Sequence, residues 1–158
     1  MSNITTFLTY REGAEDAVKF YVSIFQRSRI TRVTHYPDVP VAPTKGGVMT
    51  VEFELDGQRY IALNGGSYFS FNEGISLNVE CDTQEEIDTY TEKLTAGGGE
   101  QGPCGWVKDR FGVSWQINPR ILSQYVTDPD AAKAKRVMEA MLKMHKIDIA
   151  ALEAAAKS

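Results

Sequence analysis

Histidine and cysteine are scarce in this sequence of 158 residues, with two of each. Neither cysteine, Cys81 or Cys104, stands at the Cys-x-x-Cys or Cys/His spacing of a zinc site. Two cysteines are also too few for a disulfide framework. The sequence therefore predicts neither a structural zinc module nor a fold held together by disulfides.

An excess of basic charge is also missing, because the formal net charge is -4 and no cluster of lysine and arginine offsets it. Binding of a nucleic-acid backbone or an anionic membrane surface is therefore not expected. No apolar run is long enough to span a bilayer, and the first ten residues lack the pattern of a secretory signal. We expect a cytoplasmic protein.

What the sequence does contain is two stretches in which a strand is followed by a helix and then by further strands. In the first, the expected elements are a strand over 4–10, a helix from Gly13, and strands over 29–35, 48–55 and 59–64, with a hairpin turn at Asp56-Gly57. In the second they are a strand over 75–81, a helix capped by Thr83 and Glu86 and ended by Gly97–Gly99, and strands near 106–107 and over 113–118.

These two stretches predict an internal repeat, βαβββ followed by a second strand–helix–strands unit with a shorter middle section. Adding 70 to the first strand and helix places Ala17 on Ile87, and adding 54 to the last strand places Asn64 on Asn118. After Pro119, the Asp128-Pro129 pair is typical of a helix start, and a second short helix is expected from Asp148.

Four segments resemble the PhnB-like branch of the vicinal oxygen chelate superfamily, which includes glyoxalases and bleomycin-resistance proteins. They read GAEDAVKFYVSIF, ELDGQRYIALNGG, FNEGISLNVECDTQEEIDTYTEKL and CGWVKDRFGVSWQINP, and the closing MEAMLKMHKIDIAALEAA is similar to tails in that branch. Members often carry the label 3-demethylubiquinone-9 3-methyltransferase. A glycine-rich turn between a strand and the following helix, as a nucleotide-type cofactor requires, is not found at Gly65-Gly66 or Gly97–Gly99, so we expect no such cofactor.

The resemblance implies an α+β fold in which two βαβββ modules form a half-barrel pocket. We expect a vicinal oxygen chelate domain over residues 1–120, with modules 1–66 and 67–120, followed by a helical appendage over 121–158. The resemblance further implies assembly as a homodimer.

In metal-dependent members of the superfamily, each module supplies one ligand from its first strand and one from its last. The matching positions are Thr6, Ala62, Ser76 and Gln116, with Asn64 as an alternative inward-facing amide. Hydroxyls, amides and an alanine are poor ligands for zinc, nickel or iron. The sequence therefore predicts no bound metal and no other cofactor.

The preferred interpretation is a metal-free protein that binds a small molecule of unknown identity in a pocket lined by Thr6, Asn64, Ser76, Trp106 and Gln116. Two alternatives stay open: an enzyme of lyase, transferase or dioxygenase type that uses the same pocket, and a structural homodimer with a vestigial pocket.

Other candidate groups are weaker. His35, at the end of a strand, and His145, in the tail, have no ligand or catalytic partner at a telling spacing. Cys104 could be a thiolate beside Lys108, but a small residue before a strand is the plainer interpretation. Glu52 and Glu54 share one face of a strand, where a solvated pair is favoured over an acid/base pair.

Overall fold

The computed structural model describes residues 4–40 and 46–158, and these form two compact units, Met1–Phe71 and Asn72–Ser158. We call them the first unit and the second unit. The connection between the strands expected over 29–35 and 48–55, for which the three prolines of 36–47 predict a loop, falls partly outside the described residues.

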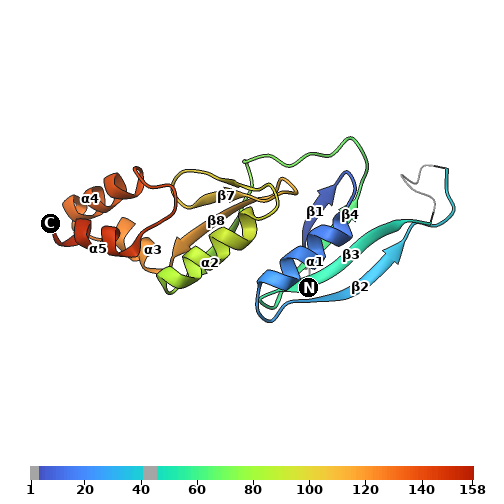
Figure 1. Cartoon of the computed structure of the whole chain (residues 1–158), viewed down its shortest axis with the longest axis horizontal. Helices are drawn as coiled ribbons and strands as arrows, with labels where there is room; N and C mark the ends of the chain where they lie inside the picture. Colours follow the sequence, from blue (N-terminus) through green and yellow to red (C-terminus); the bar gives the residue numbers. More distant parts are fainter. Residues whose placement is uncertain (1–3, 41–45) are drawn as a thin grey trace. The chain divides into compact units, whose positions relative to one another are not determined.

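The first unit is a four-stranded sheet with one helix on one face (Figure 1). Its elements are β1 (Thr6–Tyr10), α1 (Ala14–Ile24), β2 (Arg29–His35), β3 (Val48–Leu55) and β4 (Gln58–Asn64). The strand order is β1-β4-β3-β2, with β1 parallel to β4 and the other neighbours antiparallel. The predicted hairpin turn joins β3 to β4 at Asp56 and Gly57, both at positive φ, as the tight turn requires.

The second unit repeats this topology and adds three helices. Its elements are β5 (Leu77–Cys81), α2 (Gln84–Thr95), β6 (Glu100–Gln101), β7 (Trp106–Lys108), β8 (Ser114–Pro119), α3 (Ile121–Val126), α4 (Ala131–Met141) and α5 (Ile149–Lys157). The sheet order β5-β8-β7-β6 matches that of the first unit, with β5 parallel to β8. The predicted α+β fold of two βαβββ modules is confirmed, and within the described residues each sheet stays open rather than closing into a barrel.

The core of each unit lies between its sheet and its first helix. In the first unit, Tyr21 of α1 stacks on Phe53 of β3 with ring centroids 6.5 Å apart, and its hydroxyl is 3.1 Å from that of Tyr10. In the second unit, Ile87 and Leu94 of α2 are fully buried with Ile117 of β8. One face of each sheet is therefore covered by a helix, and we call the opposite face the open face of that sheet.

Thr83 caps α2 as the sequence predicts. Its side chain accepts a hydrogen bond from the Glu86 amide, the Glu86 carboxylate accepts one from the Thr83 amide, and both halves of a capping box are present. The helix ends at Ala96, and Gly97 follows at φ +74, which is the left-handed stop expected of this glycine run.

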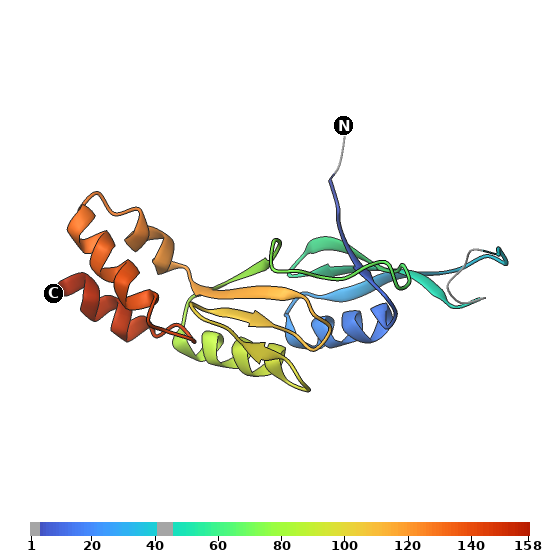
Figure 2. The same ribbon diagram turned by 90° about the horizontal axis from the view of Figure 1, so that it is seen from above.

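The tail differs from its prediction in two details. Asp130, not Asp128, caps α4, because its carboxylate accepts from the amides of Ala132 and Lys133. The short helix α3 was not predicted, since its six residues carry no capping side chain. Figure 2 shows α4 and α5 side by side at one end of the second unit.

Four hydrogen bonds fasten this tail to the body of the second unit. The backbone amides of Cys104 and Gly105 donate to the carbonyls of Met144 and His145 at 2.8 and 2.6 Å. The Gln84 side chain of α2 donates to the Ile147 carbonyl and accepts from the Ile149 amide. Within the described residues, no helix has the length and apolar character needed to cross a membrane.

Candidate functional site

Strand pairing and burial together correct the residue offsets of the repeat. In the first unit Leu8 pairs with Ala62, and in the second unit Val79 pairs with Ile117, which is fully buried like Ala62. The strand offsets are therefore 71 (8 to 79) and 55 (62 to 117), one more than the sequence alone indicates. The helix offset remains 70, because the β1–α1 connection is one residue longer than the β5–α2 connection.

A shift of one residue moves a side chain to the opposite face of a strand. Side chains two residues apart in a strand lie on the same face, so Thr6 shares the face of the buried Leu8 and Tyr10, which α1 covers. The fully buried Ala62 lies on this face as well. The first-unit counterparts of Ser76 and Gln116 are then Thr5 and Ile61. Of the four predicted ligand positions, the open faces of the sheets present only Ser76 and Gln116.

On the open face of the second sheet, Ser76 and Gln116 are joined by a hydrogen bond from the Gln116 Nε2 to the Ser76 Oγ at 2.9 Å. Asn118 continues this network, since its Nδ2 donates to Asn78 Oδ1 at 3.0 Å and lies 3.5 Å from Gln116 Oε1. Three amides and one hydroxyl therefore form a connected strip of neutral groups across β5 and β8.

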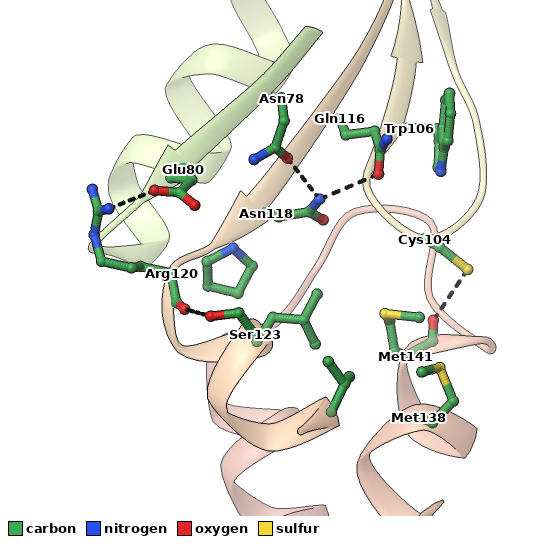
Figure 3. A pocket seen from close by; sticks show the side chains of 13 residues that line it. Asn78, Glu80, Cys104, Trp106, Gln116, Asn118, Arg120, Ser123, Met138 and Met141 are labelled. Carbon is green, nitrogen blue, oxygen red and sulfur yellow. Dashed lines mark hydrogen bonds and ion pairs between the residues drawn. The ribbon is translucent and has the colours of Figure 1, made fainter. Parts of the chain in front are cut away.

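A pocket of about 330 Å³ lies over this strip (Figure 3). Asn78, Gln116 and Asn118 line one end, Trp106 stands beside them, and Met138 and Met141 line the other end. Pro119, Leu122 and Val126 contribute further apolar surface. The pocket thus joins a polar end to an apolar end, which is the usual construction of a small-molecule site.

Charge in this pocket is paired internally. The two charged lining residues are Glu80 and Arg120, whose side chains form an ion pair at 2.5 Å. Arg120 also bonds to Asp82 at 3.0 Å, and the two carboxylates, Asp82 foremost, raise the pKa of Arg120 above its ordinary value. The guanidinium is consequently engaged and is not presented to a ligand as a free cation.

Asn64, also predicted to bind ligand, lies in the first unit and lines a different pocket, of about 890 Å³, around the start of α1. Its Oδ1 accepts from the Ala14 amide at 2.9 Å, while its Nδ2 donates to Glu15 and to the Val48 carbonyl. Asn64 therefore caps α1 from a distant strand, and these structural bonds engage both amide hydrogens.

Only some of the predicted site residues lie together in the structure. Trp106 and Gln116 line the pocket on the second sheet, and Ser76 bonds to Gln116 without lining it. Asn64 is engaged as a helix cap, and Thr6 lines neither pocket. Sequence reasoning did not place Asn78, Asn118 or the two methionines in the site. Strand alternation from Gln116 could have found the two asparagines, whereas the methionines reach the site only through the fold of the tail.

The donor chemistry does not fit a transition metal. Ser76 and Gln116 are neutral and bonded to each other, and their counterparts Thr5 and Ile61 offer a hydroxyl and a hydrocarbon. Among the described residues, no three His, Cys, Asp or Glu side chains are grouped closely enough to hold an ion. Divalent transition metals need imidazole, thiolate or carboxylate ligands to offset the loss of their hydration.

The remaining candidates have structural explanations. Cys81 and Cys104 are both free thiols. Lys108, the cation expected beside Cys104, pairs with Glu73, which raises the pKa of Lys108 and lowers that of Glu73. Glu52 and Glu54 pair with arginines of the neighbouring strand β2, Arg32 and Arg29, as a charged face does.

Comparison with known proteins assigns the family. The family model described as 3-demethylubiquinone-9 3-methyltransferase matches residues 2–118. A PhnB protein from Bacillus cereus, named after the same methyltransferase, is 36% identical, with 75% of this chain and 99% of that chain covered and a TM-score of 0.64. The chain belongs to the PhnB-like family of the vicinal oxygen chelate superfamily.

More distant solved structures share the fold of this PhnB-like protein. PA1353 from Pseudomonas aeruginosa is 20% identical over 75% of this chain and 98% of its own, with a TM-score of 0.60. A variant of the fosfomycin resistance protein FosX from Listeria monocytogenes, complexed with Mn(II) and 1S,2S-dihydroxypropylphosphonic acid, is 14% identical over 74% and 91%, with a TM-score of 0.53. The comparison with curated proteins finds no match.

Proposed function

We propose that this PhnB-like protein binds a small molecule on the open face of its second sheet without a transition metal. The observation that carries the proposal is the hydrogen-bonded strip of Ser76, Gln116, Asn118 and Asn78 on the open face, in which the three amides line the pocket and Ser76 bonds to Gln116 beside it. Amide and hydroxyl groups recognise a ligand by donating and accepting hydrogen bonds, and the apolar residues beside them exclude water.

The metal part of the proposal is tested by elemental analysis of protein purified without chelators. We expect far less than one equivalent of zinc, nickel, iron or manganese, and no change in melting temperature when EDTA is added. One equivalent of a transition metal, lost together with stability on chelation, would contradict the proposal.

The binding part is tested by thermal shift with a panel of small aromatic and organophosphorus compounds, because a ligand that binds only the folded state raises the melting temperature. We expect the shift to be lost in Ser76→Tyr, whose ring would cover the amide strip. Ser70→Tyr is the matched control, since Ser70 is exposed. Equal shifts in the two variants would place the ligand elsewhere.

Assembly as a homodimer is a further part of the proposal, and it is supported by the family resemblance and by one surface. Phe7 is 54% exposed on the open face of the first sheet, where it pairs with Ile61. A partner that covers this apolar face would remove it from water. Light scattering should give twice the chain mass, and a mass equal to one chain would contradict this part.

A further inference from the structure

The pocket of the second unit depends on the tail for more than a third of its wall. Five of its thirteen lining residues lie in the tail, beyond residue 118, where the family match ends: Leu122, Ser123, Val126, Met138 and Met141. The tail is held in place by the hydrogen bonds from Gln84, Cys104 and Gly105 and by the fully buried Ile147. The wall is therefore built on packed structure.

The two ends of this pocket have different chemistry. Met138 and Met141, three residues apart on α4, present thioethers, which adapt to flat apolar groups and make favourable contacts with aromatic rings. The opposite end presents amides, each of which can both donate and accept a hydrogen bond. A ligand that satisfies both ends has an aromatic body and a polar group that also donates and accepts.

One atom of the amide end lacks a partner. The Oδ1 of Asn118 is buried and accepts no hydrogen bond, while its Nδ2 is engaged with Asn78. A buried acceptor without a donor is unfavourable, so a donor that reaches it contributes to binding. Because this oxygen is itself buried, a ligand reaches it only when the Asn118 amide turns about its terminal torsion, which is soft in asparagine.

The charged residues of the pocket pair with each other, which disfavours an ionic ligand. Glu80 and Arg120 neutralise each other at the pocket wall, so a buried carboxylate or ammonium on the ligand would have no free counter-charge there. We infer that the tail-walled pocket takes an uncharged aromatic ligand that carries a primary amide, a lactam or a similar group. This inference rests on the proposed function and specifies the class of ligand and the part of the chain that recognises it.

The test uses the full chain with benzamide as the probe and with benzoate and benzylamine as its anionic and cationic counterparts. In NMR spectra of protein with labelled methionine methyl groups, benzamide should shift the signals of Met138 and Met141 and the side-chain amide signals of Asn78 and Asn118. The two charged compounds should bind at least about tenfold more weakly.

A matched pair of variants tests the role of the tail. Met138→Trp fills the apolar end and should weaken benzamide at least about tenfold. Leu142→Trp, four residues further on and 62% exposed outside the pocket, should leave the affinity unchanged. Both methionine and leucine sites are partly exposed, so the variants should fold, and circular dichroism checks this.

Each result is decisive. Benzoate or benzylamine binding as tightly as benzamide overturns the uncharged class, and equal affinity in the two variants overturns the role of the tail. Benzamide shifts confined to other residues overturn the inferred ligand class for this pocket, while the proposed function stands if another compound of the thermal-shift panel binds over the amide strip. Failure of benzamide together with every compound of the wider thermal-shift panel overturns the proposed function as well.

Discussion

Single residues fix the connection between the tail and the sheet of the second unit, and Gly105 is the clearest case. Its φ is +80, and an added Cβ would lie 2.7 Å from the Ile117 carbonyl oxygen and 3.0 Å from Ile147. Its amide and carbonyl bond to His145 and Ile117 on opposite sides. Only glycine fits both the backbone conformation and the space.

Gly105→Ala should therefore lower the free energy of unfolding by more than about 2 kcal/mol, from backbone strain and steric overlap combined. Gly57→Ala is the matched control, because Gly57 has φ +81 with nothing within 4 Å of an added Cβ. That variant should lose only about 1 kcal/mol. Urea denaturation measures both, and equal losses would show that the contacts around Gly105 have no role.

Cys81 makes the stability of the folded state depend on pH, and the direction follows from the pKa of its thiol. The residue is 1% exposed, and burial, followed by the charges of Glu86 and Asp82, raises the pKa of its thiol from 9.0 to about 12. The folded state thus favours the neutral thiol, so this contribution is complete below pH 9 and is lost as the pH rises toward 12.

Wild type should consequently lose stability above pH 9 by up to about 1.4 kcal/mol per pH unit relative to Cys81→Ala. Chemical denaturation at pH 8 and pH 10 measures the difference between the two slopes. Cys104→Ser, which leaves Cys81 in place, should keep the wild-type slope. Parallel slopes in wild type and Cys81→Ala would contradict the assignment.

At the scale of elements, the sequence predicts the strands and the first two helices well because their signals are local. The alternation over 48–55, the Asp56-Gly57 turn and the capping box at Thr83 all act within a few residues. The face of β1 was assigned wrongly because a one-residue difference in the β1–α1 connection leaves the helix pattern unchanged. The face of β4 was assigned wrongly because aligning Asn64 with Asn118 shifts the strand by one residue from the buried pair Ala62 and Ile117.

Long-range contacts explain the rest of what the sequence did not reveal. Asn64 ends a strand like any pocket-facing amide, and only the fold places it against the first turn of α1, 50 residues earlier in the chain. Likewise, nothing in the spacing of Met138 and Met141 distinguishes a pocket wall from an ordinary helix core.

The attachment of the tail to helix α2 can be tested by removing the side chain of Gln84. Gln84→Ala removes two hydrogen bonds between α2 and the start of α5, at 3.0 and 2.9 Å, and should cost about 1–3 kcal/mol. Hydrogen exchange should become faster across residues 144–157. Glu92→Ala, an exposed change on the same helix, should leave exchange unaltered. Unchanged protection of the tail in Gln84→Ala would contradict this attachment.

At the scale of the whole molecule, the chain holds two cores, each enclosed by its own sheet and helix. Ile147, in the tail between α4 and α5, is fully buried in the second unit. Removing its side chain beyond Cβ leaves a cavity that the packed surroundings fill only in part.

Ile147→Ala should destabilise the protein by about 2–5 kcal/mol, and native-state hydrogen exchange should show the loss in the second unit, while amides of the first unit keep their protection. Val51→Ala, at a fully buried site of the first sheet, is the reciprocal variant. An equal loss of protection in both units for each variant would show that the cores unfold together.

The parallel pairing of β1 with β4, and of β5 with β8, also has a consequence for synthesis on the ribosome. The first strand of each sheet cannot pair until the last one has been synthesised, because Phe7 pairs with Ile61 and Leu77 pairs with Trp115. Until Asn64 has left the exit tunnel, β1 lacks β4, the strand beside it in the sheet, and nascent chains halted just before and just after that point should differ sharply in protease resistance.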